Sequence, residues 1–126
     1  MNAKERLDKV RFMSQQILCL LADKDLYEKL EIECTAIKYT TEITLNDIKE
    51  LVTLRQQLSE LIERLPNQTY ITVLRLRYFG GFSWRSISDH LHFENRYIME
   101  IHKKALSELD ALIRIDELME ENRNAE

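Results

Sequence analysis

Basic side chains are concentrated in the middle of this chain, where they could bind an anion. Residues 67–107 carry six basic and three acidic side chains. Residues 1–66 carry ten basic and twelve acidic side chains, and residues 108–126 carry two basic and seven acidic ones. The formal net charge of the whole chain is -4, so attraction to an anionic partner is expected to be local to the middle segment.

The residue types that support catalysis or metal binding do not form a recognisable set. Cys19 and Cys34 lack the spacing of metal ligands and are too few for a disulfide framework, so we interpret them as small apolar helix residues. His90, His92 and His102 lack the spacing of a helical zinc site. The sequence has no glycine-rich phosphate loop and no nucleophile with a base at recognisable spacing. We therefore expect neither an enzyme nor a cofactor or metal.

The elements that must position the basic segment are expected to be helices. Two glycines, one proline and 32% charged residues favour long helices over a sheet, which needs many turns. We predict helices over 3–38 and 45–65, with a connector at 39–44, YTTEIT, whose β-branched residues are weak helix formers. No apolar run approaches the about 20 residues that span a bilayer, so we expect a cytoplasmic protein without membrane contact.

Five leucines form the clearest helical pattern, here called the leucine stripe. They keep spacings of three and four residues over two heptads: Leu51, Leu54, Leu58, Leu61 and Leu65. A stripe of this kind needs a partner helix. The partner is either the first helix, folded back as a hairpin, or the same helix of a second chain. We expect a homodimer or higher homo-oligomer through the N-terminal helices.

Both glycines stand together at the end of another predicted helix. Pro66 interrupts the leucine-rich helix, and Asn67 is a suitable cap for a helix over 68–79. Beyond that helix, Gly80 and Gly81 allow the positive φ that a sharp reversal requires.

A short helix and a longer one follow this reversal. Ser83 can cap a helix over 84–91, residues 92–94 form a turn, and the next helix begins near residue 95. The apolar faces of the two helices are Trp84, Ile87 and Leu91, and Ile98, Ile101, Ala105 and Leu106. Two helices joined in this way have the dimensions of a helix-turn-helix. An ordinary three-helix packing unit without a ligand fits the same pattern.

The segment LRLRYFGGFSWRSISDHLHFENRYIMEIHKKAL (74–106) resembles region 4 of the sigma-70 class of bacterial transcription factors. The shared frame is a leucine-arginine helix ending in Tyr-x-Gly-Gly, a Ser-Trp helix start and a final Lys-Ala-Leu. The whole chain is similar to the ArpU/RinA type of late transcriptional regulators, found in phages and prophages of Gram-positive bacteria, and the similarity is greatest over 66–109. It implies a sequence-specific regulator that binds double-stranded DNA in the cytoplasm of a bacterial host cell.

The resemblance also implies a role for individual residues. The helix over about 95–107 would lie in the major groove. The residues expected to face the bases are Asn95, Arg96, Met99 and Glu100. The residues expected to contact the DNA backbone are Arg77, Ser83, Arg85, Tyr97, Lys103 and Lys104. His102 is interpreted either as a phosphate partner or as a cap on the groove-facing surface.

Two positions depart from the family pattern. The family usually has glycine where this chain has His92, and serine or threonine where it has Glu94. Histidine at positive φ costs roughly 1 kcal/mol. Glu94 is a weak cap, although its charge suits a helix N-terminus.

The sequence thus divides into three parts: helical hairpin or coiled coil (1–65), helix-turn-helix domain (66–109), and an acidic helical extension and tail (110–126) whose apolar residues could pair between subunits. Nothing in it resembles a module that opens a promoter, so we expect a regulator and not a complete sigma factor. The alternative is a protein-interaction module that docks on RNA polymerase or another transcription factor without binding DNA.

Overall fold

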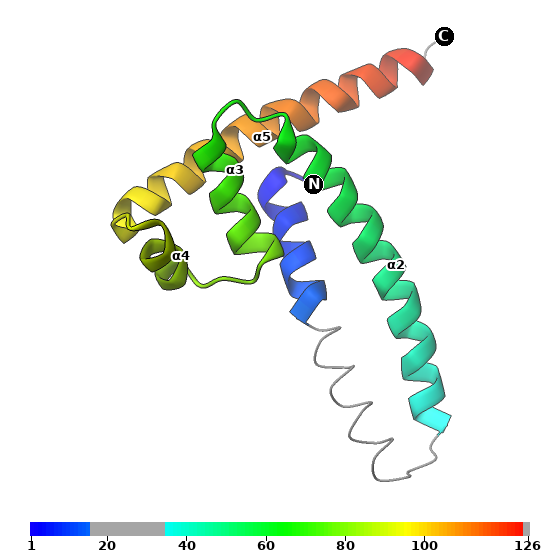
Figure 1. Cartoon of the computed structure of the whole chain (residues 1–126). Coiled ribbons are helices and arrows are strands. Elements are labelled where there is room, and N and C mark those ends of the chain that lie inside the picture. The colour runs from blue at the N-terminus through cyan, green and yellow to red at the C-terminus, as the bar shows by residue number, and fades with distance from the viewer. Residues whose placement is uncertain (16–34, 125–126) are drawn as a thin grey trace.

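The chain is helical throughout nearly all of the residues that the structure, a computed structural model, describes. These are residues 1–15 and 35–124, with side chains for 1–15 and 45–124. Residues 3–15 form an N-terminal helix. It is followed by α2 (Thr35–Glu63), α3 (Gln68–Leu74), the π-helical turn η1 (Arg75–Phe79), α4 (Trp84–Leu91) and α5 (Asn95–Asn124). The all-α prediction is confirmed. The N-terminal helix lies between α3 and α2, and α5 runs past both of them (Figure 1).

Helix α2 is longer than the sequence predicts. It begins at Thr35 and continues through residues 39–44, so the connector predicted there is wrong. Each β-branched residue lowers helix stability by at most about 0.7 kcal/mol, and this stretch contains no glycine or proline to stop cooperative propagation. Of the helix predicted over 3–38, residues 3–15 are helical and 35–38 belong to α2. The remainder, with Cys19 and Cys34, lies outside the described residues.

The other helix ends agree with the local signals in the sequence. The Asn67 side chain accepts hydrogen bonds from the amides of Thr69 (2.9 Å) and Tyr70 (3.4 Å) at the start of α3. The Ser83 hydroxyl accepts one from the Ser86 amide (3.1 Å) at the start of α4. Both predicted caps are therefore confirmed, because each satisfies amides that have no partner within the helix.

The leucine stripe packs within its own chain. Leu58, Leu61 and Leu65 are buried, and Leu51 and Leu54 are partly buried against them. The whole cluster, called the main core here, contains Ala3, Leu7, Val10, Leu58, Leu61, Ile62, Leu65, Ile71, Leu74, Tyr78, Ala105, Leu109 and Ile113. Between the two alternatives for the stripe, the structure thus places the N-terminal helix against it, together with residues of α3 and α5.

Polar contacts fix the N-terminal helix on α5. Its first amide, that of Ala3, donates a 2.7 Å hydrogen bond to the carboxylate of Asp110. Arg6 forms a 3.0 Å ion pair with Glu117 one turn further along the N-terminal helix. Because Ala3 is fully buried, the amide would be costly to leave unpaired, and the Asp110 bond offsets that cost.

The reversal after η1 uses its two glycines for different reasons. Gly80 has an ordinary helical φ, but a Cβ there would lie 3.0 Å from the Leu76 carbonyl oxygen and 3.2 Å from the Phe82 ring. Gly81 has φ +73° and open space around it. The positive φ predicted for this pair therefore falls on Gly81 alone, and Gly80 serves a close approach.

Replacing Gly81 with alanine is expected to destabilise the protein by about 1 kcal/mol, because an L residue with a Cβ is strained at this φ. Urea denaturation followed by circular dichroism measures the change. Gly81→Asn is the matched control, with roughly half the loss, because asparagine tolerates the left-handed region better. Equal losses for the two variants would show that the backbone conformation is not the cause.

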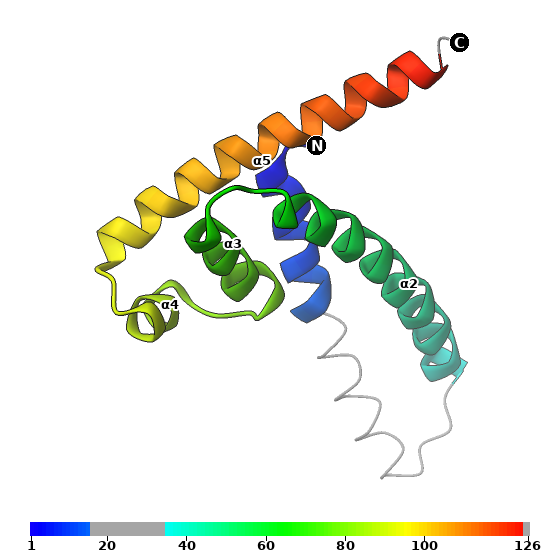
Figure 2. The ribbon, with the colours of Figure 1, turned by 45° about the horizontal axis from the view of Figure 1, so that its top comes forward.

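A second, smaller cluster holds α4 in place and is called the small core. Its buried residues are Val73, Ile87, Ile98 and Ile101, and Trp84 and Leu91 are partly buried against them. These side chains come from α3, α4 and α5, as the apolar faces in the sequence predict. The N-terminal part of α5 therefore packs by one face onto α4 and α3 (Figure 2).

Candidate nucleic-acid interface

The N-terminal half of α5 has one buried and one exposed face. Ile98, Ile101 and Ala105 are buried. Six of the exposed side chains are called the outer face of α5 here: Asn95, Arg96, Met99, Glu100, Lys103 and Lys104. Every residue predicted to read bases therefore lies on the outer face, away from the two cores, together with two of the predicted backbone contacts.

The cations of this region have no acidic partner within the described part of the chain. The ion pairs found there involve Lys4, Arg6, Lys9, Arg64 and Arg75. Arg85, Arg96, Lys103 and Lys104 are all exposed. Arg96 and Lys103 are seven residues apart and so project from the same side of α5. The outer face can consequently meet an external anion without first breaking an internal ion pair.

Arg77 differs from the other predicted backbone contacts because its guanidinium already has partners. Its Nη1 donates a 3.1 Å hydrogen bond to the Phe82 carbonyl oxygen, and its Cζ lies 4.4 Å from the centroid of the Trp84 ring. Burial, and next the nearby charge of Arg11, lower the pKa of Arg77 from its usual value. Arg77 therefore ties the reversal after η1 to the beginning of α4.

Ser83 and Tyr97 are also partly engaged within the chain. The Ser83 hydroxyl caps α4 and donates a 2.9 Å hydrogen bond to the Ser86 hydroxyl. The Tyr97 ring is exposed and packs edge-on against Phe93, with 5.1 Å between ring centroids. Tyr97 is therefore still accessible to an external partner, whereas the Ser83 hydroxyl already has a structural role as the cap of α4.

The turn between α4 and α5 contains a residue in the left-handed region, at the position where the family pattern has glycine and this chain has His92. His92 has φ 59° and ψ 36°, and its amide bonds to the Ser88 carbonyl oxygen. The next amide, that of Phe93, bonds to the same oxygen at 3.2 Å, which ends α4 in the manner of a Schellman motif. The Ile98 amide donates to the Glu94 carbonyl oxygen at 3.1 Å, so Glu94 and not Asn95 stands at the cap position of α5.

His102 is buried, so the sequence-based interpretation that places it toward phosphate is wrong. Its Nε2 lies 2.6 Å from the Tyr78 hydroxyl oxygen, and its ring is 4.6 Å from that of Trp84. The spacing Ile98, His102, Ala105 could have revealed this, because it continues the apolar face of α5. Because histidine is polar, its place on the apolar face of α5 is easily overlooked, although the ring supports the candidate interface from the buried side.

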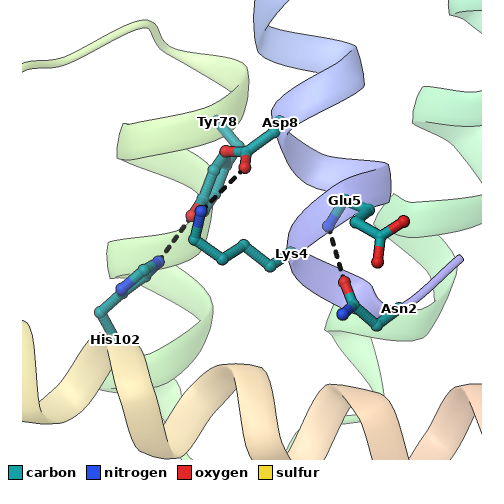
Figure 3. A network of polar contacts seen from close by, with 6 residues as sticks. All are labelled: Asn2, Lys4, Glu5, Asp8, Tyr78 and His102. Carbon is teal, nitrogen blue, oxygen red and sulfur yellow. Dashed lines mark hydrogen bonds and ion pairs between the residues drawn. The ribbon is translucent and has the colours of Figure 1, made fainter.

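A polar network surrounds this hydrogen bond (Figure 3). Lys4 and Asp8 of the N-terminal helix form a 3.0 Å ion pair beside Tyr78. Burial raises the pKa of Tyr78 to about 12. Burial, then the charges of Lys4 and Arg77, lower the pKa of His102 to about 4. Both rings are thus neutral near pH 7, and the N-terminal helix lies close to the back of the candidate interface.

Other kinds of site find little support in the described part of the chain. It contains no group of three or more His, Cys, Asp or Glu side chains placed to hold a metal ion. None of the helices found there is long and apolar enough to span a bilayer. Comparison with known proteins adds no relative, because no family model, curated protein or solved structure matches the chain.

Proposed function

We propose that this chain is a sequence-specific, double-stranded DNA-binding transcriptional regulator of phage or prophage origin, with a helix-turn-helix of the sigma-70 region 4 type. The observation that supports the proposal is the outer face of α5, where four exposed base-reading candidates lie beside two exposed lysines. Neither lysine forms an ion pair within the described residues. A helix is about 10–12 Å wide and the major groove about 12 Å, so such a face can enter the groove.

The side chains of the outer face match the chemistry of base edges. Arg96 suits the two acceptors of guanine, Asn95 suits adenine, and Glu100 can accept from cytosine. Met99, which is 41% exposed, offers an apolar contact for a thymine methyl group. Arg85, Lys103 and Lys104 would contact phosphates and set the orientation of α5 in the groove.

The small core supports this function by holding α4 and α5 as one unit. Ile87 and Ile98 are fully buried between the two helices. Arg77 and His102 both lie against the Trp84 ring, and His102 also pairs with Tyr78, so these contacts hold the same unit together. A rigid support of this kind reduces the ordering cost that binding must overcome.

The first experiment is selection of bound duplexes from random DNA, followed by fluorescence anisotropy with the selected site. Three phosphate contacts, those of Arg85, Lys103 and Lys104, predict a loss of affinity of about 40-fold between about 50 and about 200 mM salt. Failure to select any sequence, with no salt dependence of the residual binding, would overturn the proposal.

The Arg96→Ala variant is expected to bind the selected duplex about tenfold to a hundredfold more weakly and to lose preference for one base pair. Anisotropy with single-base-pair variants of the site measures both effects. Lys49→Ala removes an exposed cation from α2 and is the control, with unchanged affinity. Unaltered base preference in Arg96→Ala would remove arginine from the reading residues.

A second candidate function is docking on RNA polymerase or another transcription factor. Phe93 and Tyr97 form an exposed aromatic pair next to Glu94, and aromatic side chains are enriched at protein interfaces. Purified RNA polymerase retained by the immobilised chain, with no duplex selected, would favour this candidate. Phe93→Ala together with Tyr97→Ala should then abolish the retention.

A further inference from the structure

The C-terminal half of α5 carries an apolar stripe on its exposed side. Ile115, Leu118 and Met119 are 51%, 59% and 56% exposed, and Ala111 is exposed one turn earlier. Ala111, Ile115 and Leu118 have the four- and three-residue spacing of a coiled-coil contact line. Single exposed apolar residues are common on soluble proteins, but an aligned set of this kind indicates a contact surface. We call these four residues the C-terminal stripe.

Contacts on the other side of the helix fix the outward direction of this stripe. Leu109 and Ile113 are buried in the main core. Asp116 pairs with Arg64 at 3.0 Å, and Glu117 pairs with Arg6 at 3.0 Å. The last turns of α5 project beyond the other helices in both views (Figures 1 and 2). Within the described residues, the chain therefore leaves the stripe uncovered.

The charges beside the stripe indicate its partner. Arg114 and Glu121 are exposed, lie seven residues apart, and immediately precede Ile115 and Asn122 on the contact line. They thus occupy equivalent positions beside the contact line in successive heptads. In coiled coils, charges at such flanking positions determine which helix is the partner and whether it runs parallel or antiparallel. When two copies pair antiparallel, the side of the contact line that carries Arg114 and Glu121 lies against the same side of the other copy. Arg114 then meets Glu121 of the partner subunit, and by symmetry the same pair forms a second time.

A parallel pair lacks this complementarity. There the flank containing Arg114 and Glu121 faces the opposite flank, which carries Leu112 and Met119. Both charges would then face apolar side chains. In the antiparallel pair, Leu112 instead faces Met119 of the partner subunit.

We propose that residues 111–122 of α5 pair antiparallel with the same segment of a second copy of this chain. The pairing segment is centred about 20 residues, or about 30 Å, beyond the beginning of the outer face, so it leaves that face free. The proposal depends on the C-terminal stripe and its charges and is independent of DNA binding.

Sedimentation equilibrium of the full chain tests the pairing. A segment this short is expected to give a reversible dimer with a dissociation constant in the range of about 1 to 100 µM. Ile115→Glu combined with Leu118→Glu should remain monomeric throughout that range. Val52→Glu, at an equally exposed apolar position on α2 (56%), is the matched control and should dimerise like the original chain.

A monomer in the original chain, or an unchanged dimer in the Ile115→Glu, Leu118→Glu variant, would overturn the proposal. Dissociation by Val52→Glu alone would overturn it too and would place the contact on the N-terminal helices. Circular dichroism shows that each variant keeps its helices, as substitutions of exposed side chains should.

Charge reversal tests the antiparallel register. Arg114→Glu and Glu121→Arg are each expected to weaken the dimer about fivefold to tenfold, since each variant places two like-charge pairs together. The double variant restores opposite charges and should recover the original dissociation constant within about twofold. Additive weakening in the double variant would exclude the antiparallel register.

Discussion

Replacing Lys103 and Lys104 together with glutamate is expected to weaken binding of the selected duplex about a thousandfold. The two lysines are exposed on the outer face of α5 and have no acidic partner in the described part of the chain. Each substitution removes one phosphate contact and introduces a carboxylate that the neighbouring DNA phosphates repel. The slope of log affinity against log salt concentration should also become shallower, by the amount that corresponds to the loss of about two phosphate contacts. Anisotropy at several salt concentrations measures this slope.

A variant with the same change of net charge is the control. Lys49→Glu combined with Arg123→Glu reverses two exposed cations far from the outer face and is expected to lower affinity only severalfold, through long-range repulsion. An equal loss in both variants would show that overall charge governs binding. Retained affinity in the lysine variant would place the DNA on another surface.

Acidification is expected to destabilise the protein by about 2.5 kcal/mol between pH 7 and pH 4.5 through His102 alone. Burial and the nearby Lys4 and Arg77 charges lower the pKa of His102 in the folded protein to about 4, and the Asp8 carboxylate opposes them only in part. In the unfolded chain the pKa is about 6.5. The stabilisation is therefore complete above pH 6.5 and is lost as the pH falls toward 4, because only the unfolded chain takes up the proton in this range.

Urea denaturation of the original chain and of His102→Gln at both pH values isolates this contribution. Glutamine is neutral at all pH values and can still bond the Tyr78 hydroxyl, so its loss between pH 7 and 4.5 should be smaller by about 2.5 kcal/mol. Identical losses in the two proteins would show that His102 does not cause the acid sensitivity.

Much of the helical framework could be read from local signals in the sequence. The limits of α3 and α4 follow from Asn67 and Ser83, whose side chains bond amides only two or three residues away. The apolar faces of the small core follow from helical periodicity at Ile87, Ile98 and Ile101. Interactions that span a few residues leave their mark in a short stretch of sequence, so these features could be predicted.

The exposure of the outer face was predictable for the same reason. Arg96, Glu100 and Lys103 repeat at helical spacing on the side opposite Ile98 and Ile101. Periodicity alone thus separates residues that face a partner from residues that face the interior. Binding itself stays a prediction for the experiments described above.

Features that depend on which faces meet were decided only by the tertiary structure. The leucine stripe lies against the N-terminal helix and α5 within one chain, although its spacing suits a second chain equally well. His102 is buried between Tyr78 and Trp84, and Arg77 is held by Phe82 and Trp84. Burial by residues distant in the chain changes the pKa and the accessible partners of a polar side chain, and no local pattern records where those distant residues will lie.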